Sequence, residues 1–415
     1  MNILSMAAGA AFLITSAANA QYGEPIYHYQ GEMEAQTETG FIDLDWDIRI
    51  LDPDQQMVTF LLSSALGNVE VSGDVANFQI APQGPFNAIV IQLDEARGDA
   101  PRHIELTYDG VLFPEPMDTD INDISPDRVE LSVDGFWLPI DASFQGFFTA
   151  DLTIDVGAAW SGIANGDVVE RPTGVRVINT EPSLDIAFTL APSFRTTHHD
   201  GFSLHDLRDN NDGSDVLISA AAYCVDYLNG LYGGMDRLPH INFTINRRSG
   251  SAYNRRSYIS LTDISDTEAE TMTQFLCHEL SHHWSFGANF NTVENWLNES
   301  FAEYIGNMAV REHFGEAVFL DRMNLFASQI EGQALPAIWV PGATDRGPYL
   351  VNYRAGPVAL WELETYLGRP AFNHFITRYM VDGIDTTPDL LAMLEEISGR
   401  EARDWFEDRL AQTGH

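Results

Sequence analysis

The stretch CHELSHHWSFGANFNTVENWLNESFAEY, Cys277 to Tyr304, places three histidines and four glutamates within two expected helices. It begins with the pattern HExxH, in which the histidines are His278 and His282. Because helical positions four residues apart lie one turn apart on the same face, both imidazoles can reach one ion. Neutral imidazole is a preferred ligand of Zn²⁺, which usually takes about four ligands. The stretch therefore predicts a metal site that includes both histidines.

Glu279 lies between the two histidines, at the edge of the same helical face. From there it can accept a proton from a water that the metal activates, without binding the metal itself. The alternative is an amphipathic helix whose histidines face solvent. The apolar residues Met272, Phe275 and Leu276 argue against it, because they indicate that the motif end of the helix is buried. Burying two histidines and a glutamate together is costly without a metal or other partners.

A third ligand is expected from the second helix, which offers Glu294, Glu299 and Glu303. Glu299 and Glu303 lie one turn apart on one face, so one can bind the metal while the other orients a histidine. Spacing alone leaves the choice between them open. A third histidine ligand does not fit, because His283 is on another face and the next histidine is His313.

The composition restricts the possible partners. The 415 residues include 61 acidic and 22 basic residues, which gives a formal net charge of -39. Such a field repels nucleic acid phosphates and anionic membranes, so we expect neither as a partner. All of the basic residues are arginine. The absence of lysine excludes Schiff-base chemistry and a Walker-type phosphate loop.

Residues 1–20, MNILSMAAGAAFLITSAANA, have the form of a secretory signal peptide with a cleavage pattern near Ala20. We therefore expect an exported protein, periplasmic or extracellular; the alternative is a buried N-terminal helix. No later apolar run is long enough to predict a membrane span. Cys224 and Cys277 both lie in apolar helical contexts, so we expect two buried thiols, with a disulfide as the alternative in an exported protein.

Strand signals dominate the first half of the chain. Residues 41–51, 103–108 and 129–133 alternate apolar and polar side chains with period two, and turn clusters separate them. We expect an N-terminal β-rich domain over residues 21–195, with a β-sandwich or saddle form.

Helical periodicity dominates residues 196–415, which we expect to form a second, mainly helical domain. A helix is predicted over 216–231, and a hairpin-like pair of strands at 241–245 and 258–261. The fold class expected from both halves is α+β.

The opening stretch resembles the gluzincin aminopeptidases typified by aminopeptidase N and alanyl aminopeptidase. HELSHHW followed by WLNESFAEY is similar to that family's HExxHW, spacer and WLNEGFAxY pattern. The resemblance implies a thermolysin-like catalytic domain with one zinc ion on His278, His282 and Glu299. It also implies Glu279 as the general base, which leaves Glu303 to orient a histidine.

A second element, Tyr353-Arg354-Ala355-Gly356, is similar to the family's YxKG motif. The resemblance implies that Tyr353 stabilises the oxyanion of the tetrahedral intermediate, and a phenol can donate a hydrogen bond to such a developing charge. The alternative is an ordinary aromatic residue at a helix start. Within these two elements this chain departs from the family in three ways: Ala355 replaces the lysine, Ser300 replaces a glycine, and the spacer before Glu299 is two residues shorter than usual.

Aminopeptidases of this family carry a GxMEN segment whose glutamate binds the free α-amine of the substrate. The corresponding segment here is GSAYN, in which Gly250 and Asn254 match and Tyr253 replaces the glutamate. We expect these three residues to bind substrate, with either another acid holding the amine or no requirement for a free N-terminus. Four arginines flank the segment; we expect them to pair with carboxylates, the alternative being attraction of an acidic substrate group (Arg247, Arg248, Arg255 and Arg256).

The resemblance covers most of residues 25–412 and implies a short form without the family's large C-terminal helical domain, so that the active site is more open. The function expected is that of a zinc-dependent peptidase acting on a peptide or small amide. The alternatives are a non-catalytic zinc or peptide-binding protein on the same fold, and a zinc hydrolase of a non-peptide amide or ester. The sequence makes no prediction of an oligomeric state.

Overall fold

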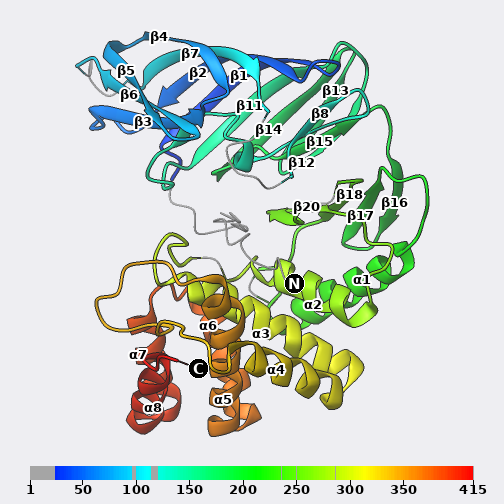
Figure 1. The fold of residues 1–415 in the computed structure, drawn as a ribbon, viewed down its shortest axis with the longest axis vertical. Coiled ribbons are helices and arrows are strands. Elements are labelled where there is room, and N and C mark those ends of the chain that lie inside the picture. Colours follow the sequence, from blue (N-terminus) through cyan, green and yellow to red (C-terminus); the bar gives the residue numbers. More distant parts are fainter. Residues whose placement is uncertain are drawn as a thin grey trace, which may run out of the picture.

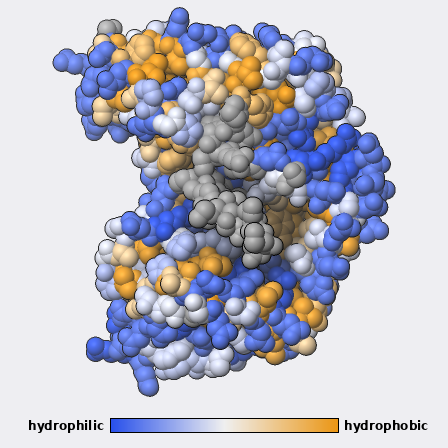
Figure 2. Space-filling view, in the orientation of Figure 1, coloured by the Kyte–Doolittle hydropathy of each residue, from blue (hydrophilic) through white to orange (hydrophobic). Residues whose placement is uncertain are grey.

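The computed structural model describes residues 24–414, except for 96–99, 114–119, 235, 249 and 286. The signal peptide predicted at residues 1–20 lies outside this range. Figure 1 shows a β-rich part at the top, a smaller sheet below it, and a layer of helices at the bottom. Figure 2 shows that the surface is indented on one side, between the β-rich part and the helical part.

The β-rich part contains three sheets within the described residues. The largest runs in the order β13 (Asp167–Arg171), β14 (Gly174–Ser183), β11 (Phe148–Asp155), β1 (Tyr27–Gln36), β2 (Phe41–Ile50), β7 (Arg102–Val111) and β4 (Leu66–Gly73). The second runs β10 (Ile140–Asp141), β3 (Met57–Ser63), β6 (Phe86–Leu93) and β5 (Val75–Gln83). The third runs β12 (Ser161–Ala164), β15 (Phe188–Ala191), β9 (Arg128–Leu131) and β8 (Asp123–Ser125), with a short helix η1 (Val133–Gly135) after β9.

The alternation seen in the sequence sets which face of each strand is buried. Along β2 the apolar side chains from Ile42 onward are buried and most of the polar ones between them are exposed, so one face of the largest sheet covers a core. Trp46 at the centre of that core donates from Nε1 to the Tyr108 hydroxyl at 2.9 Å. Its ring lies so close to β1 that a Cβ at Gly31 would come within 2.4 Å of it, which explains the glycine there.

The smaller sheet begins the second part of the chain. Its order is β16 (Arg195–His199), β17 (Phe202–Asp206), β18 (Ile241–Ile245), β20 (Tyr258–Leu261) and β19 (Tyr253–Arg255). The hairpin-like pairing predicted for 241–245 and 258–261 is wrong, because β18 and β20 are parallel neighbours. The antiparallel partner of β20 is the short edge strand β19, to which a tight turn connects it. That strand is only three residues long, too short for a recognisable alternation.

The helices pack below this sheet and enclose the second core of the molecule (Figure 1). They are α1 (Ser214–Leu231), α2 (Ala269–Ser281), α3 (Asn295–Phe314), α4 (Glu316–Ile330), the π-helical turn η2 (Val351–Ala355), α5 (Gly356–Leu367), α6 (Arg369–Asp382), α7 (Thr387–Ser398) and α8 (Arg400–Leu410). The order of a β-rich part followed by a mainly helical part confirms the predicted α+β class. In the described part of the chain, no helix combines the length and apolarity that crossing a membrane requires.

Buried ion pairs join the β-rich part to the smaller sheet. Arg255 of β19 lies 3.0 Å from a carboxylate oxygen of Asp134 and 2.7 Å from one of Asp185. Arg248 lies 3.2 Å from a carboxylate oxygen of Glu130, whose side chain is fully buried. Removing either arginine would leave buried carboxylates with less compensation, so these pairs help to fix how the two parts of the molecule meet.

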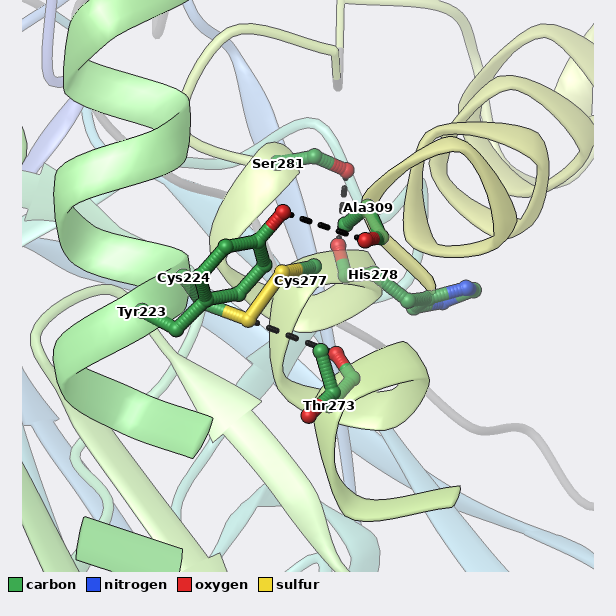
Figure 3. The surroundings of a disulfide bond; sticks show 7 residues. All are labelled: Tyr223, Cys224, Thr273, Cys277, His278, Ser281 and Ala309. Atoms are coloured by element: carbon green, nitrogen blue, oxygen red, sulfur yellow. Dashed lines mark hydrogen bonds between the residues drawn. A yellow bond between two sulfur atoms is a disulfide. The ribbon is translucent and has the colours of Figure 1, made fainter. Parts of the chain in front are cut away.

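A disulfide links α1 to α2 through Cys224 and Cys277 (Figure 3). The prediction of two free thiols is therefore wrong. Both residues are fully buried, and their Cα atoms lie 5.1 Å apart because the two helices pack against each other at this point. The sequence places each cysteine on an apolar face but does not show that the two faces meet. Cys277 directly precedes His278, so the disulfide fixes the start of the HExxH motif.

We predict that replacing both cysteines with alanine lowers the free energy of unfolding. The bond closes a loop over a sequence separation of 53 residues. By restricting the unfolded chain, a bond across such a loop raises the free energy of unfolding by about 4 kcal/mol. Chemical denaturation of wild type and of the Cys224→Ala/Cys277→Ala protein measures the difference. Wild type in strong reductant should unfold like the double variant; equal stability of all three samples would show that the bond contributes nothing.

Candidate metal centre and active site

Three buried side chains converge between α2 and α3. Glu299 places Oε2 3.6 Å from Nε2 of His278 and 3.7 Å from Nε2 of His282. The two Nε2 atoms are 3.3 Å apart. All three ligand atoms thus lie within 4.8 Å of one another, on residues that are at most 4% exposed. This is the arrangement that two helical turns facing each other produce when each contributes side chains to one point.

The other nitrogen of each histidine is held by the protein. Nδ1 of His278 lies 2.9 Å from Oε2 of Glu303, and Nδ1 of His282 lies 3.1 Å from the carbonyl oxygen of Ser285. Because a carboxylate and a carbonyl can only accept, both Nδ1 atoms carry the proton. The Nε2 lone pairs are then directed at each other and at Glu299. Such a set of acceptors calls for a cation at its centre.

The charge balance of the site leads to the same requirement. Burial lowers the pKa of His278, but hydrogen bonds to Glu299 and Glu303 outweigh it and raise this pKa to about 10. Burial lowers the pKa of His282 to about 4, with Glu299 opposing the shift. Without a metal the site thus retains one proton, which supplies a positive charge among these acceptors. Two imidazole nitrogens and a carboxylate oxygen are a donor set that suits Zn²⁺.

Glu279 is buried on the same turn of α2 and does not belong to the group of three. Burial raises its pKa to about 7, and Glu299 and Glu303 act in the same direction, whereas His278 and Arg255 oppose them. Within the described chain, its Oε2 atom has no hydrogen-bond partner. The carboxyl group is therefore available to exchange a proton with a molecule in the site, and a pKa near neutrality suits that role.

Tyr353 lies in η2, where the extra residue of a π-helical turn changes the direction of the side chains. Its ring stacks on that of His278, with the centroids 6.0 Å apart. Burial raises the pKa of Tyr353 well above its ordinary value, and Glu299 and Glu279 add to the shift. The hydroxyl therefore stays protonated and able to donate. The structure thus brings Tyr353 to the predicted metal ligands, from a segment about fifty residues further along the chain.

Ser300, which stands where the related family has glycine, links α3 to η2. Its hydroxyl donates to the carbonyl oxygen of Asn352 at 2.6 Å. A Cβ on Gly356 would lie 1.9 Å from this hydroxyl, so glycine is required at that position. The serine therefore holds the turn that carries Tyr353 against the helix that carries Glu299.

Arg354 is a site residue that sequence reasoning missed. It lies 3.2 Å from Oε1 of Glu303, whose other oxygen accepts from His278. It also donates to the hydroxyl of Tyr349 at 2.9 Å, and the Tyr349 ring stacks on Tyr353 with the centroids 4.7 Å apart. Arg354 thus contacts both the carboxylate that orients a histidine and the ring beside the catalytic candidate. Because Arg354 directly follows Tyr353 in the sequence, its position could have indicated that it lies near the site.

Residues 250–254, the predicted substrate-binding segment, make contacts mainly within the protein. Asn254 donates from Nδ2 to the backbone carbonyl of Glu279 at 2.9 Å, which joins β19 to α2. Gly250 is partly exposed, whereas Tyr253 is 1% exposed and lies among Ile121, Ala187 and Tyr258.

The prediction that the flanking arginines pair with carboxylates is confirmed for Arg248 and Arg255, described above, and for Arg247. Arg247 reaches Asp209 at 3.1 Å on the surface. Arg256 donates to the carbonyl oxygen of Pro182.

We expect Arg354→Met to weaken zinc binding by about tenfold or more, because Glu303 loses its counter-charge and holds His278 less firmly. Chelator competition with the metal-free protein measures the affinity. The matched control is Arg378→Met, which removes an arginine paired with Asp382 on α6. An affinity equal to that of the control would show that Arg354 does not support the site.

Comparisons with known proteins find related sequences, although no family model matches the chain. Aminopeptidase N of Streptomyces lividans is 29% identical over 196 residues, which are 43% of this chain and 22% of that protein. Aminopeptidase M1-C of Oryza sativa subsp. japonica is 30% identical over 155 residues, which are 34% of this chain and 17% of that protein. The match thus spans about a fifth of the length of these relatives.

Solved structures share the fold over nearly the whole chain. The M1 zinc metallopeptidase of Deinococcus radiodurans has a TM-score of 0.69 at 16% identity, and the match covers 94% of this chain and 96% of that one. Yeast LTA4 hydrolase in complex with bestatin has a TM-score of 0.70 at 14% identity, over 94% of this chain and 68% of that one. Sequence similarity to aminopeptidases and the fold of M1 zinc metallopeptidases together confirm the resemblance to the gluzincin aminopeptidase N family.

Proposed function

We propose that this protein is a zinc-dependent peptidase that holds one zinc ion on His278, His282 and Glu299. The observation that carries the proposal is the convergence of these three ligand atoms, with both Nδ1 atoms held by the protein. A structure of the Deinococcus radiodurans relative with a bound Tyr-Ser-Ala substrate supports peptides as the substrate class. Zinc in such a site polarises a carbonyl and makes a water more acidic.

The side chains of the site have separable tasks. Glu279 takes a proton from the attacking water and later delivers one to the leaving amine; its carboxyl group is buried beside the ligands, and its Oε2 atom has no hydrogen-bond partner among the described residues. Tyr353 donates from its hydroxyl to the oxyanion that develops on the carbonyl oxygen. Glu303 and Ser285 hold the Nδ1 protons, so that the histidines keep their Nε2 lone pairs directed into the site.

Two alternatives share the fold and the metal. A non-catalytic zinc or peptide-binding protein needs neither Glu279 nor Tyr353, and the placement of both beside the ligands favours catalysis. A zinc hydrolase of a non-peptide amide or ester would use the same residues. Turnover of a peptide library, with and without chelator, distinguishes a peptidase from both.

We further propose that the protein acts outside the cytoplasm, after cleavage near Ala20. The disulfide between Cys224 and Cys277 supports this location, because such bonds persist in oxidising compartments. Mass spectrometry of the mature protein tests it: the chain should begin near Gln21 and carry the disulfide. An intact N-terminus with reduced cysteines would contradict export.

We predict that Glu279→Gln abolishes peptide hydrolysis, with a loss of kcat of about a thousandfold or more, while one zinc ion stays bound. The amide keeps the size of the side chain but cannot accept the proton. Metal content by mass spectrometry and turnover of a fluorogenic peptide are measured on the same sample. The Tyr353→Phe variant should lose kcat without losing metal. Full activity of the glutamine variant would overturn the proposed role of Glu279.

A further inference from the structure

Tyr253 precedes Asn254 on β19, and Asn254 donates to the backbone carbonyl of Glu279, so this strand adjoins the proposed active site. The family resemblance puts an amine-binding glutamate at this position, and this chain has a tyrosine instead. The hydroxyl of Tyr253 donates to Oε1 of Glu130 at 3.2 Å. Burial raises the pKa of this phenol well above its ordinary value, so it carries no negative charge. A neutral phenol already bonded to a carboxylate does not replace the charge that an ammonium group requires.

Glu130 is the acid next to Tyr253, and the protein already occupies it. Its side chain is fully buried and accepts hydrogen bonds from Arg248 Nε at 3.2 Å, from Asn246 at 3.2 Å and from the Ser260 hydroxyl. Arg248 also neutralises its charge. Arg128 is a second cation there, with Nε 3.7 Å from Oε2 of Glu130. A substrate ammonium would have to displace an arginine from a buried ion pair, which is unfavourable.

Two guanidinium groups flank the same ring. Those of Arg248 and Arg255 lie 5.4 Å and 5.1 Å from the centroid of Tyr253. Arg255 is in turn neutralised by Asp134 and Asp185, so these aspartates are also engaged.

Carboxylates nearer the metal ligands have other partners. Glu299 belongs to the group of three ligands, and Glu303 is bonded to His278 and Arg354. The acids named here are thus engaged: Glu130, Asp134 and Asp185 by arginines of the protein, and Glu299 and Glu303 in the metal site.

We propose that the substrates are peptides that continue, or are blocked, on the N-terminal side of the scissile bond, so that no free α-amine is recognised. The inference rests on the proposed peptidase function. On this inference the protein is an endopeptidase or an enzyme that acts on N-acylated peptides. The relatives found by sequence are named aminopeptidases.

The test uses pairs of fluorogenic peptides that are identical except for a free or an acetylated N-terminus. An amine anchored by a buried charge is worth about 2–5 kcal/mol, so acetylation would then reduce kcat/KM by at least about thirtyfold. We expect the acetylated peptide to be cleaved as fast as the free one or faster. A loss of about tenfold or more on acetylation overturns the inference.

A binding measurement makes the result independent of turnover. The same peptides are titrated into zinc-loaded Glu279→Gln protein by calorimetry, and their Kd values should agree within about tenfold. If wild type cleaves neither peptide, the peptidase proposal fails, and the ratio of the Kd values still decides this inference. Tighter binding of the free amine by a larger factor overturns it.

Two matched variants check that the tyrosine itself does not recognise the amine. Tyr253→Phe and Tyr258→Phe each remove one buried hydroxyl from the same network. Both should leave the ratio of kcat/KM for the two peptides unchanged. A selective loss of activity toward the free peptide in Tyr253→Phe alone would contradict the inference.

Discussion

The convergence of two imidazole nitrogens and one carboxylate oxygen in a buried site is the constraint on which the rest of the site depends. Nε2 of His278, Nε2 of His282 and Oε2 of Glu299 lie within 4.8 Å of one another, and a positive charge among them, a proton or a metal ion, stabilises the arrangement. Further side chains and a backbone carbonyl hold these three ligand atoms in position. Glu303 and the Ser285 carbonyl fix the imidazoles, Arg354 neutralises Glu303, and Ser300 holds the turn that carries Tyr353. The helices are held in turn by a disulfide one residue before the first histidine.

The parts of the site that depend on local geometry could be predicted from the sequence. The spacing of His278 and His282 puts them on one helical face, and alternation along β2 indicates which of its side chains are buried. Spacing could not choose between Glu299 and Glu303, because they also share a face. The structure shows the difference: one carboxylate faces both Nε2 atoms, and the other faces an Nδ1 atom.

Features that depend on contacts between distant segments could not be predicted. Cys224 and Cys277 were predicted to be buried free thiols, because the sequence does not show which helix faces meet. The strands β18 and β20 read as a hairpin because the insertion of β20 between β18 and β19 is a matter of topology. Glu130 lies in the β-rich part, more than a hundred residues before its partners Arg248 and Tyr253. It carried no signal in the sequence, yet it binds both Arg248 and the hydroxyl of Tyr253.

X-ray absorption at the zinc edge of protein reconstituted with one equivalent of zinc tests the central claim most directly. We expect two nitrogen ligands from imidazole and oxygen ligands that include a carboxylate, all at about 2.0–2.2 Å, and a loss of the imidazole signal in His278→Ala/His282→Ala protein. Zinc that does not bind, or that keeps its imidazole ligands in the double variant, would show that the three converging side chains are not the metal site.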